Sequence, residues 1–475
     1  MGSVSVAKRD GGSSTLDEAT VDAFRAGLRG ELVGAGDPGY HVTRALWNAM
    51  IDRRPALIAR CAGTADVIHS LKFAQEHDLL FSVRGAGHNI AGKGSVDDGL
   101  MIDLSQMRDV WVDPAARTAR VGPGATLADV DHETQAFGLA VPVGINSTTG
   151  IAGLTLGGGF GWISRKHGLT VDNLLSADVV TADGRLVRAS ATEEPDLFWG
   201  LRGGGGNLGI VTSFEFRLFP LGPEVTAGLV VHPFKDAQGV MRRWRDFCKT
   251  APDEATCWLV ARKAPPLPFL PAEWHGREVV VLAMVYAGDM AAGEKAFESL
   301  RSYGKPIADV VGPHPFAGFQ QAFDPLLTPG ARNYWKSHNF AEMSDDAIDT
   351  ILKYAARLPS AQSEIFVAQM GGATARVPAD ATAYPHREAQ FVMNVHTRWE
   401  KPKDDASSVA WAREFFEATA PFATGGVYVN FVSEDEERVQ AAYGANFERL
   451  AVLKKKYDPD NVFRVNQNVA PAAKG

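Results

Sequence analysis

The sequence predicts an α+β protein built from more than one domain. Its 475 residues are enough for about three units at the usual ~150 residues each. The 45% hydrophobic and 22% charged fractions are those of a globular protein with a large buried core. Strand patterns follow one another in the first half of the chain, and strands alternate with helices in the middle.

The elements of the first half are expected in the following order. Residues 1–15 are expected as a flexible leader, and residues 16–32 as a helix. The segment 56–83 predicts a strand, then a helix with apolar residues at helical spacing, and then a second strand. Further strands are expected at 99–104 and 118–124.

The second of those strands runs into a loop of small residues that ends in a histidine. Arg84 has a planar guanidinium suited to pyrophosphate. Gly85, Ala86 and Gly87 let backbone N–H groups approach phosphate oxygens. His88 then follows where a cofactor ring would meet it. The loop alone fits a glycine turn ending in a solvated or core histidine at least as well, because short motifs are weak.

A second segment dense in glycine, residues 148–162, changes that balance. It interleaves glycines with Ile, Leu, Phe and Trp, which costs too much conformational entropy for a plain helix or strand. It is expected to form a backbone wall against a broad planar ligand, or alternatively a barrel corner or a set of bulges. Two such loops about sixty residues apart, one with a terminal histidine, favour a shared flat cofactor.

A literal GxGxxG pattern occurs at Gly204, Gly206 and Gly209. A nicotinamide-binding fingerprint must open a helix. Residues 210–218 alternate like a strand instead, so a nicotinamide site is excluded.

Composition excludes several other classes. The net charge of -8 argues against a nucleic-acid partner. Three cysteines without CxxC pairing, and no clustered His and carboxylate spacing, argue against a disulfide framework, a metal site and a metal hydrolase. No secretory signal or membrane-length apolar run is visible, so a soluble, cytoplasmic protein is expected. The lysines at 454–456 are expected in the last turn of a helix.

Taken together, the motifs resemble those of FAD-linked oxidases of the vanillyl-alcohol oxidase superfamily, in its berberine-bridge-enzyme-like branch. Arg84-Gly-Ala-Gly-His88 resembles the family's flavin-attachment loop, and residues 153–161 resemble its isoalloxazine-facing loop. Further similar stretches are 178–184, 196–205 and the terminal Tyr457-Asp-Pro-Asp-Asn-Val-Phe-Arg-Val-Asn-Gln-Asn468. The resemblance spans most of the chain.

The resemblance implies a PCMH-type FAD-binding domain of two α+β subdomains and a substrate domain with an antiparallel sheet covered by helices. A leader and N-terminal helix are expected at 1–34, the FAD-binding domain at 35–221 and the substrate domain at 222–424. Residues 425–475 are expected to return to the FAD domain. The Pro/Gly-rich stretch at 219–224 fits the linker.

The resemblance also implies a covalent bond from His88 to the flavin 8α-methyl carbon. Many members add a second bond from a cysteine, but that position is Asn146 here, so a single link is expected. Thr149 occupies the family's oxygen-gating position, and its size favours an oxidase. Other FAD contacts implied by the resemblance come from Asn89, Asn146, Thr148, Thr149, Gly150, Gly153, Leu154, Gly158, Gly159, Gly161, Gly209, Ile210, Val211, Tyr428, Asn430, Asn466 and Asn468.

The family's catalytic phenol lies in a Tyr-x-Asn motif, here Tyr428 and Asn430. Residues 427–431 alternate as a strand, which places both side chains on one face. As a base, Tyr428 would need its pKa lowered from about 10 by positive charge or hydrogen bonds; a core or edge tyrosine is the alternative. A second family tyrosine is replaced by Phe160.

Other candidate catalytic groups come from the middle of the chain. Residues 333–340 alternate so that Tyr334, Lys336 and His338 share a face. Lys336 and His396 rank first, and Gln369 is a similar case, because a buried lysine or imidazole near a flavin positions or deprotonates a substrate. For each residue a purely structural role is an equal alternative.

The implied reaction is oxidation of a C–H next to an alcohol or amine, with hydride passing to FAD and O2 reduced to hydrogen peroxide. A flavin dehydrogenase with another acceptor, and a non-catalytic flavin- or drug-binding protein, remain as alternatives. The substrate, a sugar, alkaloid, aromatic alcohol or other secondary metabolite, is not specified by the sequence, and neither is the oligomeric state.

Overall fold

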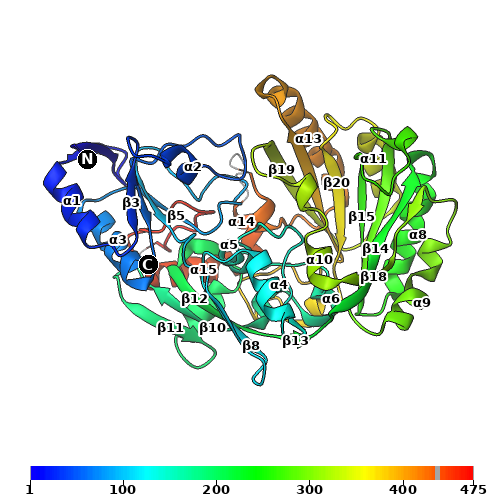
Figure 1. Ribbon diagram of the computed structural model, residues 1–475, viewed down its shortest axis with the longest axis horizontal. Helices are drawn as coiled ribbons and strands as arrows, with labels where there is room; N and C mark the ends of the chain where they lie inside the picture. Colours follow the sequence, from blue (N-terminus) through cyan, green and yellow to red (C-terminus); the bar gives the residue numbers. More distant parts are fainter. Residues whose placement is uncertain (1, 434–438, 474–475) are drawn as a thin grey trace.

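The two ends of the chain lie together in one lobe, and the middle of the chain forms the other (Figure 1). The computed structural model describes residues 2–433 and 439–473. In Figure 1 the blue and red ends meet on one side, and the green to orange middle occupies the other side. No helix within these two ranges is long and apolar enough to cross a membrane.

The first subdomain is built on a four-stranded sheet in the order β3-β4-β6-β5, in which β4, β6 and β5 are parallel. Its strands are β3 (Glu31–Gly34), β4 (Leu57–Arg60), β5 (Phe81–Arg84) and β6 (Leu100–Asp103). Its helices are α1 (Glu18–Ala26), α2 (Tyr40–Arg44) and α3 (Thr64–Glu76). The predicted strands and helix between residues 56 and 104 are confirmed.

Two predictions for the N-terminus are wrong. The flexible leader predicted at 1–15 is wrong for its described part, because β1 (Val4–Ala7) pairs with β2 (Ser13–Leu16) and Val6 is buried. The helix predicted at 16–32 is shorter. Asp17 caps its start by accepting a hydrogen bond from the Thr20 N–H at 2.8 Å, and the chain has already entered β3 by Glu31.

The second subdomain contains a five-stranded antiparallel sheet in the order β11-β10-β12-β8-β7. Its strands are β7 (Val110–Asp113), β8 (Thr118–Val121), β10 (Leu174–Val180), β11 (Leu186–Ser190) and β12 (Ile210–Arg217), with the small pair β9 (Leu139–Ala140) and β13 (Phe219–Pro220) beside it. The helices are α4 (Leu127–Gln135), α5 (Ile151–Leu156), α6 (Ser164–His167) and α7 (Pro195–Leu201). The strand predicted after the GxGxxG pattern is therefore confirmed as β12.

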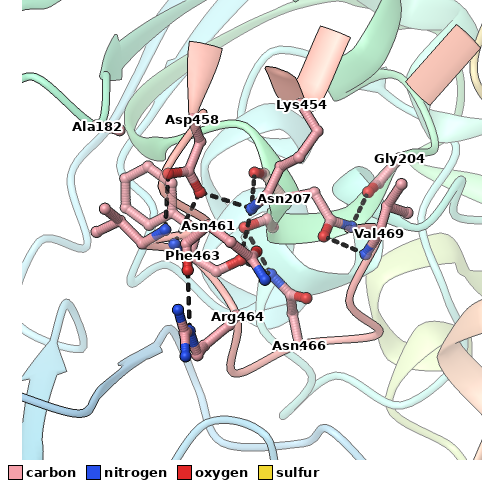
Figure 2. Close-up of polar contacts among 12 residues, drawn as sticks. Ala182, Gly204, Asn207, Lys454, Asp458, Asn461, Phe463, Arg464, Asn466 and Val469 are labelled. Atoms are coloured by element: carbon pink, nitrogen blue, oxygen red, sulfur yellow. Dashed lines mark hydrogen bonds and ion pairs between the residues drawn. The ribbon is translucent and has the colours of Figure 1, made fainter. Parts of the chain in front are cut away.

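The C-terminal segment packs back onto this subdomain through α14 (Val439–Tyr443) and α15 (Phe447–Tyr457). Figure 2 shows a buried ion pair that fixes the segment. The Lys454 ammonium donates to the Asp458 carboxylate at 2.6 Å and to the Asn207 and Phe463 carbonyls at 2.8 Å each. Lys454 and Asp458 are fully buried, with all three ammonium protons engaged. The last turn of α15 thereby anchors the chain that follows it.

The middle of the chain forms an eight-stranded antiparallel sheet in the order β17-β14-β16-β15-β20-β21-β19, with β18 also paired to β14. Its strands are β14 (Glu224–Pro233), β15 (Ala255–Lys263), β16 (Glu278–Tyr286), β17 (Ala308–Asp309), β18 (Gly312–Pro315), β19 (Arg332–Phe340), β20 (Glu364–Gln369) and β21 (Phe391–Trp399). The short helices α10 (Phe316–Gln320) and α12 (Ala373–Arg376) join some of these strands.

Four amphipathic helices cover one face of this sheet: α8 (Ala237–Thr250), α9 (Met290–Arg301), α11 (Asp345–Ala355) and α13 (Asp405–Thr419). Their buried Trp244, Phe297, Ile351 and Phe415 pack on alternate strand residues. The other face, which carries Trp258, is turned toward the first lobe. The fold class predicted from the sequence is confirmed: two α+β subdomains and an antiparallel sheet covered by helices.

Candidate active site

A cavity of about 380 Å³ extends from the N-terminal glycine loop to the uncovered face of the eight-stranded sheet. The cofactor-side wall comes from the end of β5, from residues 144–157, from residues 205–211 and from the C-terminal segment 463–467. The opposite wall is rich in aromatic side chains and includes Trp258, Trp335, Phe366 and Phe431. Four segments from distant parts of the sequence and one sheet thus enclose a single space.

The loop after β5 presents unused hydrogen-bond donors to this cavity. Among the described residues, no acceptor is found for the backbone N–H groups of Gly85, Ala86, Gly87 and His88. Gly87 has a φ of 78°, which favours glycine. Successive backbone N–H groups without an acceptor, on a loop that lines a cavity, are what an anion-binding nest requires, so this loop suits a pyrophosphate.

Arg84 does not serve this nest as predicted. Its guanidinium donates to both carboxylate oxygens of Asp103, at 3.0 and 2.7 Å. It also donates to the Thr43 carbonyl and, at 3.3 Å, to the Ala45 carbonyl. The side chain donates four hydrogen bonds to protein acceptors. It therefore stabilises the loop and does not bind a phosphate.

His88 lies at the cavity wall between an aromatic ring and two hydroxyl groups. Its ring stacks on Trp47 with centroids 5.1 Å apart. Its Nε2 is 2.9 Å from the Thr148 hydroxyl, and its Nδ1 is 3.4 Å from the Thr149 hydroxyl. Burial lowers the pKa of His88 to about 3, so the imidazole is neutral at physiological pH and available as a nucleophile.

The glycine-dense segment is not the flat wall that the sequence suggested. Residues 151–156 form α5, and a glycine turn follows it. Gly158 and Gly159 have φ values of 118° and 74°, and a Cβ on either would collide with Tyr384 or Thr170. Most of these glycines therefore allow close packing within the protein. Gly153 is the exception, because a Cβ there would meet no atom within 4 Å.

The two glycine-rich loops do share one site, as predicted. A Cβ on Gly150 would lie 2.9 Å from Ala86. The candidate cofactor residues that line the cavity are Arg84, Gly85, Ala86, Gly87, His88, Asn89, Asn146, Thr149, Gly150, Gly153, Leu154, Gly209, Ile210, Val211, Tyr428, Asn430 and Asn466. The candidates outside its lining are Thr148, Gly158, Gly159, Gly161 and Asn468.

Tyr428 and Asn430 meet at the cavity, although the predicted strand is absent. Residues Val429–Phe431 form a 3₁₀ turn, and the Asn430 amide donates to the Tyr428 hydroxyl at 2.9 Å. The Gly159 N–H donates to the same oxygen at 3.1 Å. Burial outweighs these two bonds and raises the pKa of Tyr428 to about 12. The phenol is therefore protonated in the resting protein, contrary to the requirement for a base.

Lys336 and Gln369 do not line the cavity. Lys336 extends from the helix-covered face of β19, where its ammonium lies 5.4 Å from the Phe416 ring centroid of α13. Gln369 lies on the same side of β20 and accepts a hydrogen bond from the Cys257 N–H at 2.9 Å. The neighbouring β19 residue Trp335 faces the cavity instead. The predicted catalytic placement of Lys336 and Gln369 is wrong because the alternation pointed them at the helices.

His396 does line the cavity, and it brings a partner that sequence reasoning missed. Its Nδ1 is 3.0 Å from a Glu364 carboxylate oxygen. The other Glu364 oxygen is 2.8 Å from the Arg262 guanidinium. Further missed lining residues are Trp47, Gly206, Trp258, Trp335, Asn394 and Tyr443. No sequence signal pointed to Arg262 and Glu364, because both faces of β15 and β20 are buried and the two residues meet only through strand pairing. Trp47 lies in irregular chain and gave no signal either.

The cavity fits a long cofactor with a pyrophosphate and a flat ring system. The nest at Gly85–His88 supplies phosphate donors. A Cβ on Gly206, like one on Gly153, would meet no atom within 4 Å. The backbone at these two cavity-lining positions is therefore open to contact with a planar group. Asn466, held by two bonds from its amide nitrogen, leaves its side-chain oxygen without a partner within the described chain. These features fit a cofactor that joins a pyrophosphate to a flat ring system, as FAD does.

Comparisons with known proteins agree. Residues 55–190 match the family model "FAD binding domain", and residues 427–470 match "Berberine and berberine like". The chain is 31% identical over 455 residues to the uncharacterised FAD-linked oxidoreductase YgaK of Bacillus subtilis (strain 168), covering 94% of this chain and 97% of that one. It therefore belongs to the berberine-like FAD-linked oxidoreductases and is an FAD-dependent enzyme.

Two solved structures share the fold. One is 6-hydroxy-D-nicotine oxidase from Arthrobacter nicotinovorans, with a TM-score of 0.84 and 27% identity, covering 94% of this chain and 98% of that one. The other is xylooligosaccharide oxidase from Myceliophthora thermophila C1 in complex with xylobiose, with a TM-score of 0.83 and 25% identity, covering 96% of this chain and all of that one (100%).

Proposed function

We propose that this protein is an oxidase that removes a hydride from a C–H next to an alcohol or amine of a small molecule. The electrons pass to O2 and give hydrogen peroxide. The observation that carries the proposal is the single cavity that joins the Gly85–His88 nest to the sheet face bearing Tyr428 and His396. FAD bound there supplies a two-electron acceptor, and the protein supplies orientation, proton acceptance and control of access.

His88 is the proposed point of covalent attachment to FAD, and its hydrogen bonds support this role. The Thr148 hydroxyl donates its proton to the Asn146 side-chain oxygen at 2.8 Å. It must therefore accept from His88, whose Nε2 is 2.9 Å away. This places the ring proton on Nε2 and leaves a lone pair on Nδ1, which is the nucleophilic atom. A single link is proposed because Asn146 offers no thiol.

Use of oxygen as the acceptor is supported by Thr149, whose side chain lies at the cavity wall beside His88. A threonine is about as small as a valine and leaves room that a leucine would fill. A dehydrogenase using another acceptor is the second candidate. It would share every other feature of the site.

The substrate is proposed to be a small molecule with an extended apolar or ring surface. The wall opposite the nest is formed largely by aromatic side chains. Aromatic faces bind both flat heterocycles and the apolar faces of sugar rings, and the two similar oxidases are named for a nicotine and a xylooligosaccharide. The wall therefore supports either class.

The test is a screen of alcohols, sugars and amines with the FAD-loaded protein. Anaerobic mixing measures bleaching of the flavin absorption, and an oxygen electrode measures uptake in air. An oxidase bleaches, consumes O2 and forms an equal amount of peroxide. Bleaching with transfer to an added dye but no O2 uptake would assign a dehydrogenase. Absence of bleaching with every compound would contradict an enzymatic role for the cavity.

A further inference from the structure

Three charged or titratable side chains lie side by side on the cavity face of the eight-stranded sheet. Arg262 of β15 stands opposite Glu364 of β20, and Glu364 stands opposite His396 of β21. Directly opposite residues on neighbouring strands share a face and lie within contact distance. The salt bridge from Arg262 is 2.8 Å long and the Glu364–His396 contact is 3.0 Å. All three residues line the cavity.

This row fixes the tautomer of His396. An ionised carboxylate only accepts hydrogen bonds, so the Nδ1 next to Glu364 carries the ring proton and donates it. Although burial acts to raise it, the Arg262 charge and the His396 contact lower the pKa of Glu364 to about 2. The carboxylate is therefore ionised throughout the working pH range. Nε2 is left with a free lone pair.

The Nε2 atom of His396 is buried and has no partner among the described residues. The ring is 3% exposed, and Trp335 meets its edge with centroids 4.6 Å apart. Burial lowers the pKa of His396; Glu364 opposes this change, and the Arg398 and Arg262 charges add to it. A neutral imidazole with an unused acceptor atom thus stands at the cavity wall.

The groups that face His396 also set the charge that the cavity accepts. They are Glu364 on the neighbouring β20, Arg262 on β15 beyond it, Arg398 on its own strand, and the uncharged Trp335 on β19. Glu364 is the one carboxylate among the described lining residues, and Arg262 already neutralises it. A protonated amine would find no unpaired anion here. An uncharged hydroxyl finds an acceptor.

We propose that His396 Nε2 accepts the hydroxyl proton of an uncharged alcohol substrate, and that Glu364, held by Arg262, positions His396 for this step. The inference rests on the proposed oxidase function and narrows its substrate class. The O–H and adjacent C–H bonds of the alcohol break and a C=O bond forms. The proton goes to Nε2, and the hydride carries two electrons to FAD. Glu364 stabilises the resulting imidazolium.

Tyr428 is the other candidate for the base, but its surroundings favour a role as hydrogen-bond donor. Its oxygen already accepts two hydrogen bonds, from Asn430 and Gly159. With its pKa raised to about 12 the phenol keeps its proton. It therefore acts as a hydrogen-bond donor to substrate, while His396 accepts the proton.

The first test needs no substrate. Ring ¹⁵N NMR of the purified holoenzyme, labelled at histidine, is compared for the wild type and His396→Gln. The signal lost in the variant is expected to be that of a neutral ring with Nδ1 protonated and Nε2 unprotonated at pH 7. A ring protonated at Nε2 would overturn the proposal, whether or not the protein proves to be an oxidase. His232→Gln, at a buried histidine outside the cavity lining, is the matched control.

The second test uses paired probes, benzyl alcohol with benzylamine and cyclohexylmethanol with cyclohexylmethylamine, in anaerobic flavin reduction. The alcohols are expected to be the faster members, and His396→Gln is expected to slow them at least about 100-fold, the usual contribution of a general base. The acidic limb of the wild-type pH profile should fall below the ordinary pKa of histidine and disappear in the variant. Faster reduction by the amines, or an unchanged limb, would overturn the assignment.

The positioning role of Glu364 has its own readout. Glu364→Gln keeps a hydrogen-bond acceptor but removes the charge that stabilises the imidazolium. It is expected to lower the reduction rate about 10-fold while leaving the apparent affinity for the alcohol unchanged. A variant that changes affinity alone would show that Glu364 has no part in proton transfer. Absence of FAD from the purified protein would contradict the proposed function. The same ¹⁵N comparison, made on the FAD-free protein, would then decide the tautomer of His396.

Discussion

The indole of Trp47 stacks on the imidazole of His88, with centroids 5.1 Å apart and ring planes inclined by 24°. The same indole donates its N–H to the Leu327 carbonyl at 3.0 Å, and the Arg398 guanidinium lies 5.3 Å from its ring centroid. Trp47 thus connects the flavin-side histidine to the sheet lobe. The orientation of His88 depends on a residue about forty positions earlier in the chain.

Replacing Trp47 by leucine is expected to reduce covalent flavin attachment while leaving the fold intact. Without the stacked indole, the His88 ring is held by two hydroxyl groups alone and loses its fixed orientation. The fraction of protein that keeps flavin after acid precipitation should fall several-fold. Trp111→Leu, at a tryptophan that is 63% exposed, should retain the wild-type fraction. Equal fractions for the two variants would show that the stack does not orient His88.

Replacing Tyr428 by phenylalanine is expected to leave FAD binding intact and to slow flavin reduction about 10-fold, the loss of one hydrogen bond to the substrate. The change also leaves two donors, the Gly159 N–H and the Asn430 amide, without their acceptor. This loss is expected to lower the free energy of unfolding by about 1–2 kcal/mol. Tyr384→Phe is the control, because the Tyr384 hydroxyl has no partner within the described chain. Reduction at the wild-type rate would remove Tyr428 from the chemistry.

Replacing Lys454 by methionine is expected to lower the free energy of unfolding by about 3–5 kcal/mol, because it leaves the buried Asp458 without its cation. Urea denaturation measures this loss. An exposed lysine of the same turn supplies the control: Lys456→Met should change stability by less than about 0.5 kcal/mol. Similar losses in both variants would mean that the ion pair in Figure 2 stabilises the C-terminal segment no more than a surface lysine does.

Asp131 gives a pH dependence of opposite sign to that of most carboxylates. It is buried between α4 and α10, and burial raises its pKa to about 7, with Gln320 as its hydrogen-bond donor at 3.1 Å. In the unfolded chain it ionises near pH 4. The native state therefore binds more protons between these values, and the free energy of unfolding falls as pH rises from about 4 to 7.

The corresponding variant is Asp131→Asn, which cannot ionise. At pH 8 it is expected to be more stable than the wild type by about 2–4 kcal/mol, with a much smaller gain at pH 4. Denaturant unfolding at both pH values measures this difference. Glu133→Gln, at an exposed position of the same helix, should show no such divergence. A constant difference across the range would mean that Asp131 is ionised in the native protein.

The sequence predicted the fold and the shared cofactor loops because glycine spacing and periodicity are local signals. It did not decide which face of β19 meets the cavity. An alternation of two places Tyr334, Lys336 and His338 together, but both faces of this sheet are buried, so the pattern cannot tell helices from cavity. The prediction that Lys336 faces the substrate is wrong for that reason.

Long-range partners were equally hidden. Arg84 carries the charge expected of a phosphate ligand, but its guanidinium forms an ion pair with Asp103 on a neighbouring strand. Glu364 contacts Arg262 and His396 only because β20 pairs between β15 and β21. Tyr428 and Asn430 meet as predicted, although a 3₁₀ turn brings them together instead of a strand.

The central claim is that His88 holds FAD covalently at the head of a catalytic cavity. Intact-mass analysis of the acid-precipitated, washed protein tests it most directly, with His88→Ala as the paired sample. The wild-type pellet is expected to be yellow and heavier by one FAD, and the variant pellet to be colourless after the same treatment. Flavin that remains attached in His88→Ala, or a wild-type pellet of unmodified mass, would contradict the account.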